Sequence, residues 1–539
     1  GRNGGPGATT SFFLRGQDST NVVIMVDGVR SQADAIGALT MTDMPLAQIE
    51  RIEILRGNAG ALYGESAIGG VINIFTRKGK GVPRAYGALT YGSRNTSEMN
   101  AGYGGSIADY SFDFNAGITK TDGFSSMNPS QNTAINPERD GYSNRFASVK
   151  VDKKINSDLT LGVRANIKNS KTDFDNDSFG SGRQSDTHQF KITSDLVGVS
   201  ARQAVTDAWV SSLDFSGSNF SYENIKNGAT PLTGLYNGHQ DTVRWFNAYQ
   251  LQTNTLVNFG VDRLNEQYQQ RSSYNMTRDT LGYFVGLTNK VNQFTFQANV
   301  RRDSVNVASS MVGQPNDTQA TTGLLGLGYQ VSPQWRLTST VSTGFRAATA
   351  DEASLNPLLN PEKHKAYEVG IVYSSGESVA RVTYFQTSTH DAIIYNSDYS
   401  ATTNLGEVRN KGVEGTVRSR WMGNNIKLTI VKQDPWNITD NERLARRANQ
   451  YGSLDVSRSI AHYELGARVY ASGDRKNSHW DTESLGGYAI WSFYASRKID
   501  NEWTARVKLE NVFDRQYQLA YGYNTPGRGI FATLQYQPK

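Results

Sequence analysis

The sequence predicts an all-β fold whose strands cross a membrane as a barrel, preceded by a small N-terminal domain of mixed α/β structure. Three observations support this fold class. Apolar and polar residues alternate with period two over most of the chain, no apolar run is long enough for a spanning helix, and a break rich in charge and glycine ends the first 83 residues.

The alternation begins near Tyr86 and continues to the end of the chain. Between Trp503 and Glu510 the apolar side chains take one face of an expected strand, and the charged and polar ones take the other. Soluble sandwiches and propellers also alternate, so this pattern alone leaves both classes open. Two features favour the barrel. Aromatic residues gather near strand ends, as membrane girdles require, and the polar faces carry full charges that a dry core could not hold unpaired.

The overall composition fits strands that cross a bilayer. Only 37% of the 539 residues are hydrophobic, while 27 are Tyr and 52 are Gly. A spanning helix needs roughly 20 consecutive apolar residues, whereas a spanning strand needs about 9 to 11 residues of which every second is apolar. A helical membrane protein is therefore excluded.

No pattern in the sequence indicates catalysis, and we expect a protein that is not an enzyme. The absence of Cys removes thiol chemistry and cysteine-bound metals, and the six histidines show no HExxH spacing. The stretch GESAIGG from Gly64 has the spacing GxSxxG and no partnered His, and Gly57 to Gly70 lacks the Lys-Ser/Thr ending of a phosphate loop. Lys plus Arg number 55 and Asp plus Glu number 50, so the even charge argues against nucleic acid as a partner.

The first 83 residues have a different pattern from the rest. They contain glycine clusters, an expected buried strand at Val22–Val26 and a second strand near Ile52–Leu55. The break at Arg77–Pro83 combines charge, Gly and Pro, which is typical of a boundary. We therefore predict a small domain over residues 1–83 and a barrel over residues 84–539.

Several long motifs in both parts together resemble one family over nearly the whole chain, the TonB-dependent outer-membrane receptors. The motifs are SFFLRG from Ser11, VVIMVDGVR from Val22, IERIEILRGNAGALYGESAIGGVINIFTRK from Ile49, STGFRAA from Ser342, LNPEKHKAYEVG from Leu359, NKGVEG from Asn410 and LENVFDRQYQLAYGYNTPGR from Leu509.

The resemblance implies a barrel of about 22 antiparallel strands in the outer membrane of a Gram-negative bacterium, closed by the N-terminal domain as a plug. A passive porin would need no plug. It also implies active transport powered by TonB, contact with outer-membrane lipid and lipopolysaccharide, and exposure to phage or colicin-type toxins. The energy-coupling box and the first plug strands of the family are absent from this sequence, so TonB coupling is an expectation taken from the family. We expect a monomer.

Within the family, the C-terminal YGYNTPGR and the spacing of the plug motifs are most similar to the cobalamin (vitamin B12) receptors. Haem receptors carry a His between two boxes that correspond here to FRAA at Phe345 and the segment near Asn360, and this chain has none there. A ferric-siderophore receptor stays open as an alternative. So does a surface receptor or adhesin that uses long loops such as 128–142 and 396–404.

The resemblance places a corrinoid ligand between the plug apex and the external loops, facing two plug loops at 30–37 and 58–66. Their residue types suit a large neutral amphiphile and lack the cation cluster that an anionic iron chelate would favour. The expected ligand-binding residues are Arg30, Gln32, Asp34, Asn58, Ala59, Ala61, Tyr63 and Ser66.

An acidic run in an expected external loop is a candidate calcium site, because calcium requires hard oxygen ligands. Cobalamin receptors order a similar loop with calcium. A solvated acidic loop is the alternative, since the spacing is not that of an EF-hand. The expected ligands are Asp173, Asp175, Asp177 and Asp186, completed by Asp241 from the next external loop.

Family resemblance also pairs four charges between plug and barrel. Arg15 in FLRG and Arg56 in ILRG belong to plug motifs, whereas Glu368 in YEVG and Glu414 in GVEG belong to expected barrel strands. Arginine suits this role because its planar fork can grip carboxylates with two hydrogen bonds and stays protonated. Such pairs would seat the plug in one orientation and still allow its release.

Overall fold

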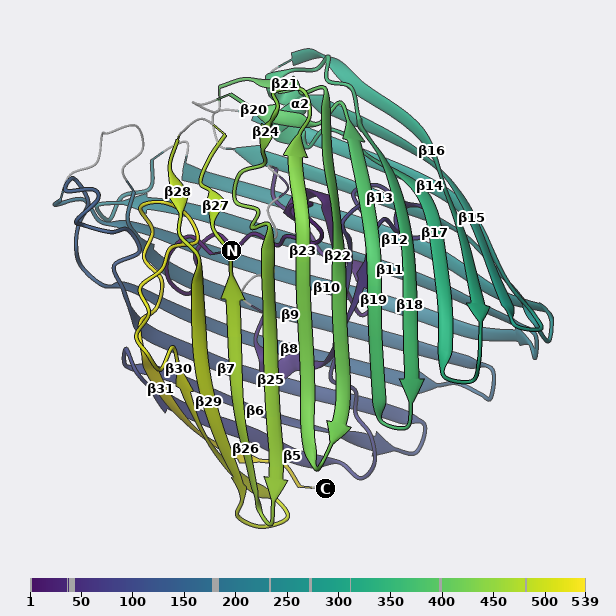
Figure 1. Cartoon of the computed structure of the whole chain (residues 1–539), viewed down its shortest axis with the longest axis horizontal. Coiled ribbons are helices and arrows are strands. Elements are labelled where there is room, and N and C mark those ends of the chain that lie inside the picture. The colour runs from purple at the N-terminus through teal and green to yellow at the C-terminus, as the bar shows by residue number, and fades with distance from the viewer. Residues whose placement is uncertain are drawn as a thin grey trace.

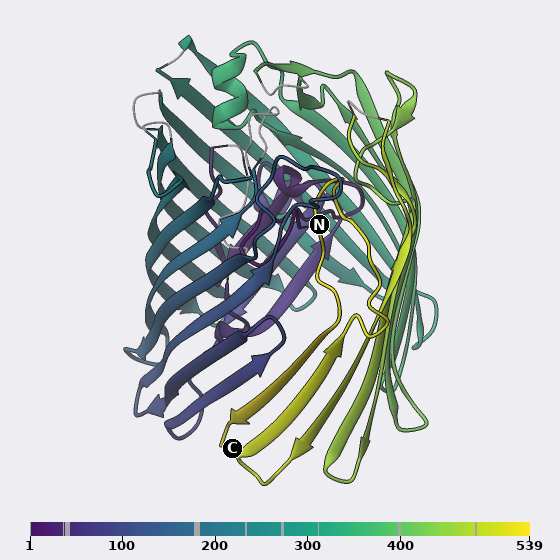
Figure 2. The ribbon, with the colours of Figure 1, turned by 90° about the vertical axis from the view of Figure 1, so that its left-hand side faces the viewer.

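The computed structural model describes residues 2–35, 37, 44–176, 184–231, 234–270, 274–310, 312–396, 400–479 and 482–538. Most of these residues form one closed antiparallel barrel, with the N-terminal domain inside its lumen (Figures 1 and 2). The predicted fold class, a barrel of 22 strands closed by an N-terminal plug, is confirmed. Within these described ranges no helix has the length and apolarity to cross a bilayer.

The 22 long strands follow one another around the wall, and β31 pairs with β5 to close it, with Phe531 opposite Gly92 and Tyr536 opposite Gly87. The strands are β5 (Arg84–Gly92), β6 (Thr96–Ile107), β7 (Tyr110–Phe124), β8 (Asp140–Lys154), β9 (Leu159–Phe174), β10 (His188–Thr206), β11 (Trp209–Lys226), β12 (Leu235–Gln252), β13 (Thr255–Gln270), β14 (Tyr274–Val291), β15 (Phe294–Ser309), β16 (Val312–Gln330), β17 (Trp335–Arg346), β18 (Glu362–Ser375), β19 (Ser378–His390), β22 (Glu407–Trp421), β23 (Asn424–Asn437), β25 (Gln450–Ile460), β26 (Tyr463–Ser472), β29 (Tyr488–Lys498), β30 (Trp503–Glu510) and β31 (Gly529–Tyr536).

Each strand alternates an apolar outer face with a polar inner face. On β9, Leu161, Val163 and Ile167 are 41%, 49% and 48% exposed on the outside, while Lys168 on the inner face is buried. A band of exposed large apolar side chains would be a liability in water and is what contact with lipid requires. The outer band therefore marks the part of the wall that lies in the bilayer.

The two ends of the barrel differ. Short turns join strands at the end that carries the C-terminus, and long connections rise from the other end (Figure 1). The long connections contain the short elements α2 (Ala350–Leu355), β20 (Ile393–Tyr395), β21 (Thr402–Asn404), β24 (Glu442–Arg443), β27 (Arg475–Lys476) and β28 (Ser484–Leu485). Long loops are typical of the extracellular end of such barrels.

The plug is built on a four-stranded sheet in the order β2-β1-β4-β3, in which β1 and β4 are parallel. Its central strand β1 is buried along its whole length. Val22, Ile24 and Val26 pack on one side of the sheet, and Val23 and Met25 pack on the other. The plug elements are η1 (Ser19–Asn21), β1 (Val22–Val26), β2 (Val29–Arg30), η2 (Leu46–Gln48), β3 (Ile49–Arg56), α1 (Gly60–Tyr63) and β4 (Gly70–Thr76).

Candidate functional site

The structure brings the four charges from the FLRG, ILRG, YEVG and GVEG motifs into contact between plug and wall. The guanidinium of Arg15 lies 2.8 Å from Glu368 on β18 and 3.6 Å from Glu414 on β22. Arg56, at the end of β3, donates a short hydrogen bond to Glu414. Arg15 and Glu414 are 7% and 6% exposed, so these pairs are poorly solvated.

A steric requirement explains why a glycine follows each of these arginines. Gly57 has φ +90°, and a Cβ there would lie 1.9 Å from Oε1 of Glu368. Gly16 has φ +78°, and a Cβ there would lie 2.6 Å from Nδ2 of Asn410, which donates to the carbonyl of Arg15. Both plug turns therefore pass so close to the wall that only glycine fits.

A second ion-pair network joins the plug to β13 and β14, and sequence reasoning missed it. Glu65, in the GESAIGG turn, accepts from Arg278 of β14 at 2.6 Å and from Arg30 of the plug at 3.0 Å. Arg278 also pairs with Glu266 of β13 at 2.9 Å, and Tyr268 donates to Glu266 and to the carbonyl of Ala33. Burial alone would raise the pKa of Glu65, but the charges of Arg278 and Arg30 outweigh it and lower that pKa to about 2.

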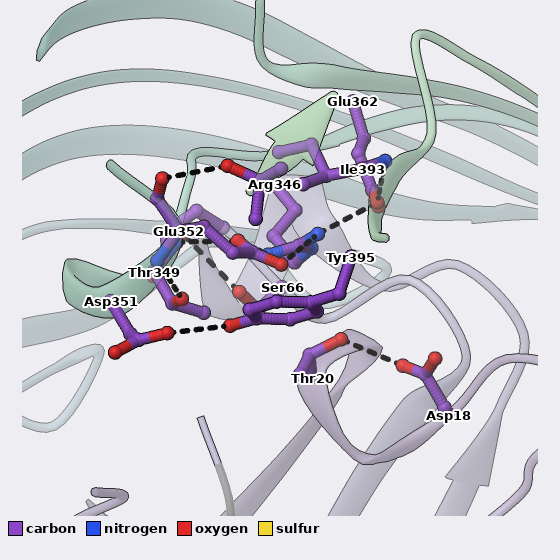
Figure 3. Close-up of polar contacts among 12 residues, drawn as sticks. Asp18, Thr20, Ser66, Arg346, Thr349, Asp351, Glu352, Glu362, Ile393 and Tyr395 are labelled. Atoms are coloured by element: carbon purple, nitrogen blue, oxygen red, sulfur yellow. Dashed lines mark hydrogen bonds and ion pairs between the residues drawn. The ribbon is translucent and has the colours of Figure 1, made fainter. Parts of the chain in front are cut away.

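A third buried network organises the FRAA segment above the plug (Figure 3). Arg346 donates to both carboxylate oxygens of Glu352, at 2.6 and 3.2 Å, and to Glu362 at 2.7 Å. Glu352 also completes a capping box with Thr349 at the start of α2. The backbone N–H of Ile393 donates to Glu362, which ties the loop strand β20 to the same acid. The capping box is visible in the sequence as Thr349-x-x-Glu352, whereas the shared arginine is not.

The residues expected to face a corrinoid mostly do not form an open surface. Gln32, Asn58, Ala59, Ala61 and Ser66 are buried. Ala59 and Ala61 are buried because α1 and its N-cap pack against the wall strands β15 and β17. Of the other three, Arg30 is committed to Glu65, and Asp34 and Tyr63 are half-buried. Contact of these eight residues with a ligand stays a prediction.

The described members of the expected calcium set do not gather in one cluster, and calcium binding by this set stays a prediction. Asp173 accepts from Gln189 on the neighbouring strand, and Asp186 pairs with Lys226 at 2.8 Å. Asp241 pairs with His239 at 3.0 Å and is exposed, because it alternates with the buried Gln240 on β12. Asp175 groups instead with Glu138 and Asp140, and Asp177 lies outside the described residues.

A cavity of about 380 Å³ lies between the N-terminal part of the plug and the extracellular ends of β25, β26 and β29. Its wall is aromatic and basic. Tyr488 stacks on Tyr517 with ring centroids 4.4 Å apart, and the guanidinium of Arg475 lies 5.3 Å from the ring centroid of Tyr488. The arginine and tyrosine side chains that line it, besides Arg447, are Arg446, Arg475, Tyr451, Tyr470, Tyr488 and Tyr517.

Arg446 and Arg475 differ in their partners from four other arginines that face the plug or the cavity. Arg15, Arg278 and Arg346 each pair with carboxylates, and Arg447, which also borders the cavity, reaches Asp18 at 3.3 Å. Among the described residues no carboxylate forms an ion pair with Arg446 or Arg475, and Nε of Arg475 is buried without an acceptor. The cavity therefore holds positive charge that no described carboxylate neutralises through an ion pair.

Comparison with known families agrees with this architecture. Residues 84–512 match the family described as TonB dependent receptor-like, beta-barrel, and residues 2–71 match the TonB-dependent Receptor Plug Domain. The chain belongs to the TonB-dependent receptor family. It is a TonB-dependent transporter of the Gram-negative outer membrane, in a family of receptors and transporters.

Solved structures of the same fold include three iron receptors. The ferric yersiniabactin uptake receptor FyuA from Yersinia pestis is 20% identical with a TM-score of 0.81, and the match covers 98% of this chain and 91% of that one. The FrpB iron transporter from Neisseria meningitidis is 15% identical with a TM-score of 0.82, covering 99% and 94%. The ferripyoverdine receptor of Pseudomonas aeruginosa is 14% identical with a TM-score of 0.82, covering 99% and 82%. At these identities the likeness shows the fold alone.

Proposed function

We propose that this transporter takes up an anionic ferric chelate of the siderophore class. The observation that carries the proposal is the pair of arginines, Arg446 and Arg475, that face the aromatic cavity without a carboxylate partner among the described residues. Leaving a partly buried cation uncompensated is costly, so a protein retains it where an anion binds. Tyrosine rings beside the guanidinium groups add flat apolar surface and hydroxyl donors for an aromatic chelate.

The two plug loops alone favoured a neutral ligand, because they lack a cluster of cations. Two successive external connections of the barrel supply cations instead, Arg446 before β25 and Arg475 after β26. Solved structures of similar fold include a ferric yersiniabactin uptake receptor, an iron transporter and a ferripyoverdine receptor, so this fold is compatible with such substrates but does not choose among them.

A corrinoid is the second candidate substrate. It rests on the YGYNTPGR motif and the plug motifs, which are most similar to those of cobalamin receptors. A corrinoid is large, mostly uncharged and amphiphilic, so its binding would not depend strongly on the two arginines.

Titration of the purified receptor by calorimetry separates the two candidates. Ferric yersiniabactin, ferripyoverdine and cyanocobalamin are each added to the wild type, to Arg475→Gln and to the control Arg443→Gln, whose exposed side chain lies outside the cavity. We expect a ferric chelate to bind and Arg475→Gln to weaken it by about tenfold or more, since a charged hydrogen bond contributes about 1.5 to 3 kcal/mol. Binding of cyanocobalamin at micromolar concentration without binding of either ferric chelate would establish the second candidate and reject the first.

A further inference from the structure

The barrel wall below the aromatic cavity carries a series of cations that face the lumen. The registers of the neighbouring strands place these side chains on the same face of the wall as Glu414, which contacts the plug. None of them forms an ion pair or a hydrogen bond with another described residue, and all but the first are exposed. These residues, called the lumen cations below, are Arg336 on β17, Arg381 on β19, Arg418 on β22, Lys427 on β23, Arg468 on β26 and Arg506 on β30.

The lumen cations continue from the cavity that holds Arg446 and Arg475. Tyr470 lines that cavity, and Arg468 is the next residue on the same face of β26 toward the periplasmic end. Two carboxylates share this part of the wall, Asp455 and Glu464, so cations outnumber them. Positive charge therefore extends from the cavity toward the end of the barrel that carries the short turns.

The opposite wall, from β8 to β15, differs because most of its lumen-facing cations are paired. Lys150 pairs with Asp27 of the plug at 2.9 Å, and Arg301 pairs with Asp303 at 2.8 Å. An exception is Arg202, which lies on the inner face of β10 near its periplasmic end and is exposed. An anion that moved along this wall would have to displace carboxylates that already hold the guanidinium and ammonium groups.

One contact between plug and wall separates the cavity from the lumen cations. Glu414, Val431 and Tyr451 lie side by side across β22, β23 and β25. Tyr451 lines the cavity, and Arg56 of the plug contacts Glu414. Arg418 follows Glu414 on the same face of β22, toward the periplasmic end. A plug that withdrew from Glu414 would therefore connect the cavity to the lumen cations.

We propose that an anionic cargo crosses the lumen along the wall of the lumen cations, while the plug keeps its contacts with the opposite wall. Unpaired cations in a lumen raise the local concentration of an anion. Because these side chains are exposed, each binds an anion only weakly and can pass it on. That the cargo is a ferric chelate rests on the proposed function, whereas the side of the lumen rests on the charges alone.

Charged thiol reagents test the assigned side without any chelate, because the chain has no Cys. Thr416→Cys places a thiol opposite Arg381 and beside Arg418, and the control Asn258→Cys places one on the inner face of β13, near the paired Asp262. We expect the ratio of modification rates by an anionic and a cationic methanethiosulfonate to be at least about fivefold higher at Thr416→Cys than at the control. Replacing Arg381 and Arg418 by Gln should lower the ratio to that of the control, and so should about 1 M salt.

Uptake of ⁵⁵Fe from the ferric chelate that binds in the titration above tests whether this wall carries the cargo. The variant combines Arg418→Gln with Lys427→Gln, and the matched control is Arg202→Gln, which removes a lumen-facing cation from the opposite wall. For the combined variant we expect uptake at saturating chelate to fall at least about fivefold, while the calorimetric affinity stays within about twofold of the wild type. The retained affinity also shows that the variant folds.

The two measurements separate this proposal from the proposed function. Unchanged uptake in the combined variant, an equal loss of uptake in Arg202→Gln, or equal reagent ratios at the two cysteines would each overturn the assigned side of the lumen. If neither ferric chelate binds the wild type, the proposed function fails, and the reagent ratios alone then support or overturn the assigned side.

Discussion

Removing the charge of Glu65 should weaken the seating of the plug more than any exposed charge could. Glu65 is 1% exposed and pairs with Arg278 and Arg30. The substitution Glu65→Gln therefore removes a negative charge that balances the buried guanidinium of Arg278. The pKa of this carboxyl falls from the ordinary 4.5 to about 2. Because one pKa unit corresponds to about 1.36 kcal/mol, the ionised carboxylate contributes about 3 kcal/mol to the stability of the folded plug. Breaking a buried ion pair costs about 3 to 5 kcal/mol in general, which agrees.

The lack of Cys in the chain offers a direct assay. A single cysteine placed by Val26→Cys is buried in the plug sheet and reacts with a thiol reagent only when the plug opens. The labelling rate as a function of urea gives the free energy of plug unfolding while the barrel stays folded. The matched control is Glu53→Gln, because Glu53 pairs with Arg51 at the surface, where an ion pair contributes under about 1 kcal/mol. The reasoning is refuted if Glu65→Gln costs no more than this control.

Three further predictions concern the same contact between plug and wall. The effects of Arg56→Ala and Glu368→Ala on plug unfolding should fall short of additive, because both act on one charge cluster; strict additivity in this double-mutant cycle would contradict the shared network. Gly57→Ala should destabilise the plug by about 1 to 3 kcal/mol in the same urea assay, since the added Cβ meets Glu368 at a left-handed backbone position, and an unchanged midpoint would reject this. The stability of the plug should not change with pH above pH 4.5 and should fall as the pH is lowered toward about 2, because Glu65 has a depressed pKa in the folded state. The variant Glu65→Gln should not show this fall.

The barrel could be predicted from sequence because its signal is repeated along every strand. Alternation such as that from Trp503 to Glu510 specifies two faces, and charges on one of them exclude a dry core. The number of strands came from the family resemblance and not from periodicity. The glycines after Arg15 and Arg56 are visible in the sequence as a repeated pair, and the structure supplies their steric reason.

Contacts that depend on the register of distant strands could not be predicted. Glu65 meets Arg278, which also pairs with Glu266, because β13 and β14 pass the plug at one height, and nothing local in the sequence specifies that height. The described members of the expected calcium set do not form one cluster, because the side of the wall on which a residue lies depends on where a strand ends. Asp173 lies within β9 and bonds across to Gln189, whereas Asp175 follows the end of β9 and turns toward Ser126.

The most direct test of the account is uptake by Gram-negative cells that lack other receptors for the ligands and produce this transporter. Accumulation of ⁵⁵Fe from ferric yersiniabactin or ferripyoverdine is measured beside accumulation of ⁵⁷Co-cyanocobalamin, with and without TonB, for the wild type and Arg475→Gln. The account predicts that ⁵⁵Fe accumulates, that deletion of TonB abolishes it and that Arg475→Gln reduces it several-fold at limiting ligand. Accumulation of ⁵⁷Co without ⁵⁵Fe, unaffected by Arg475→Gln, would contradict it.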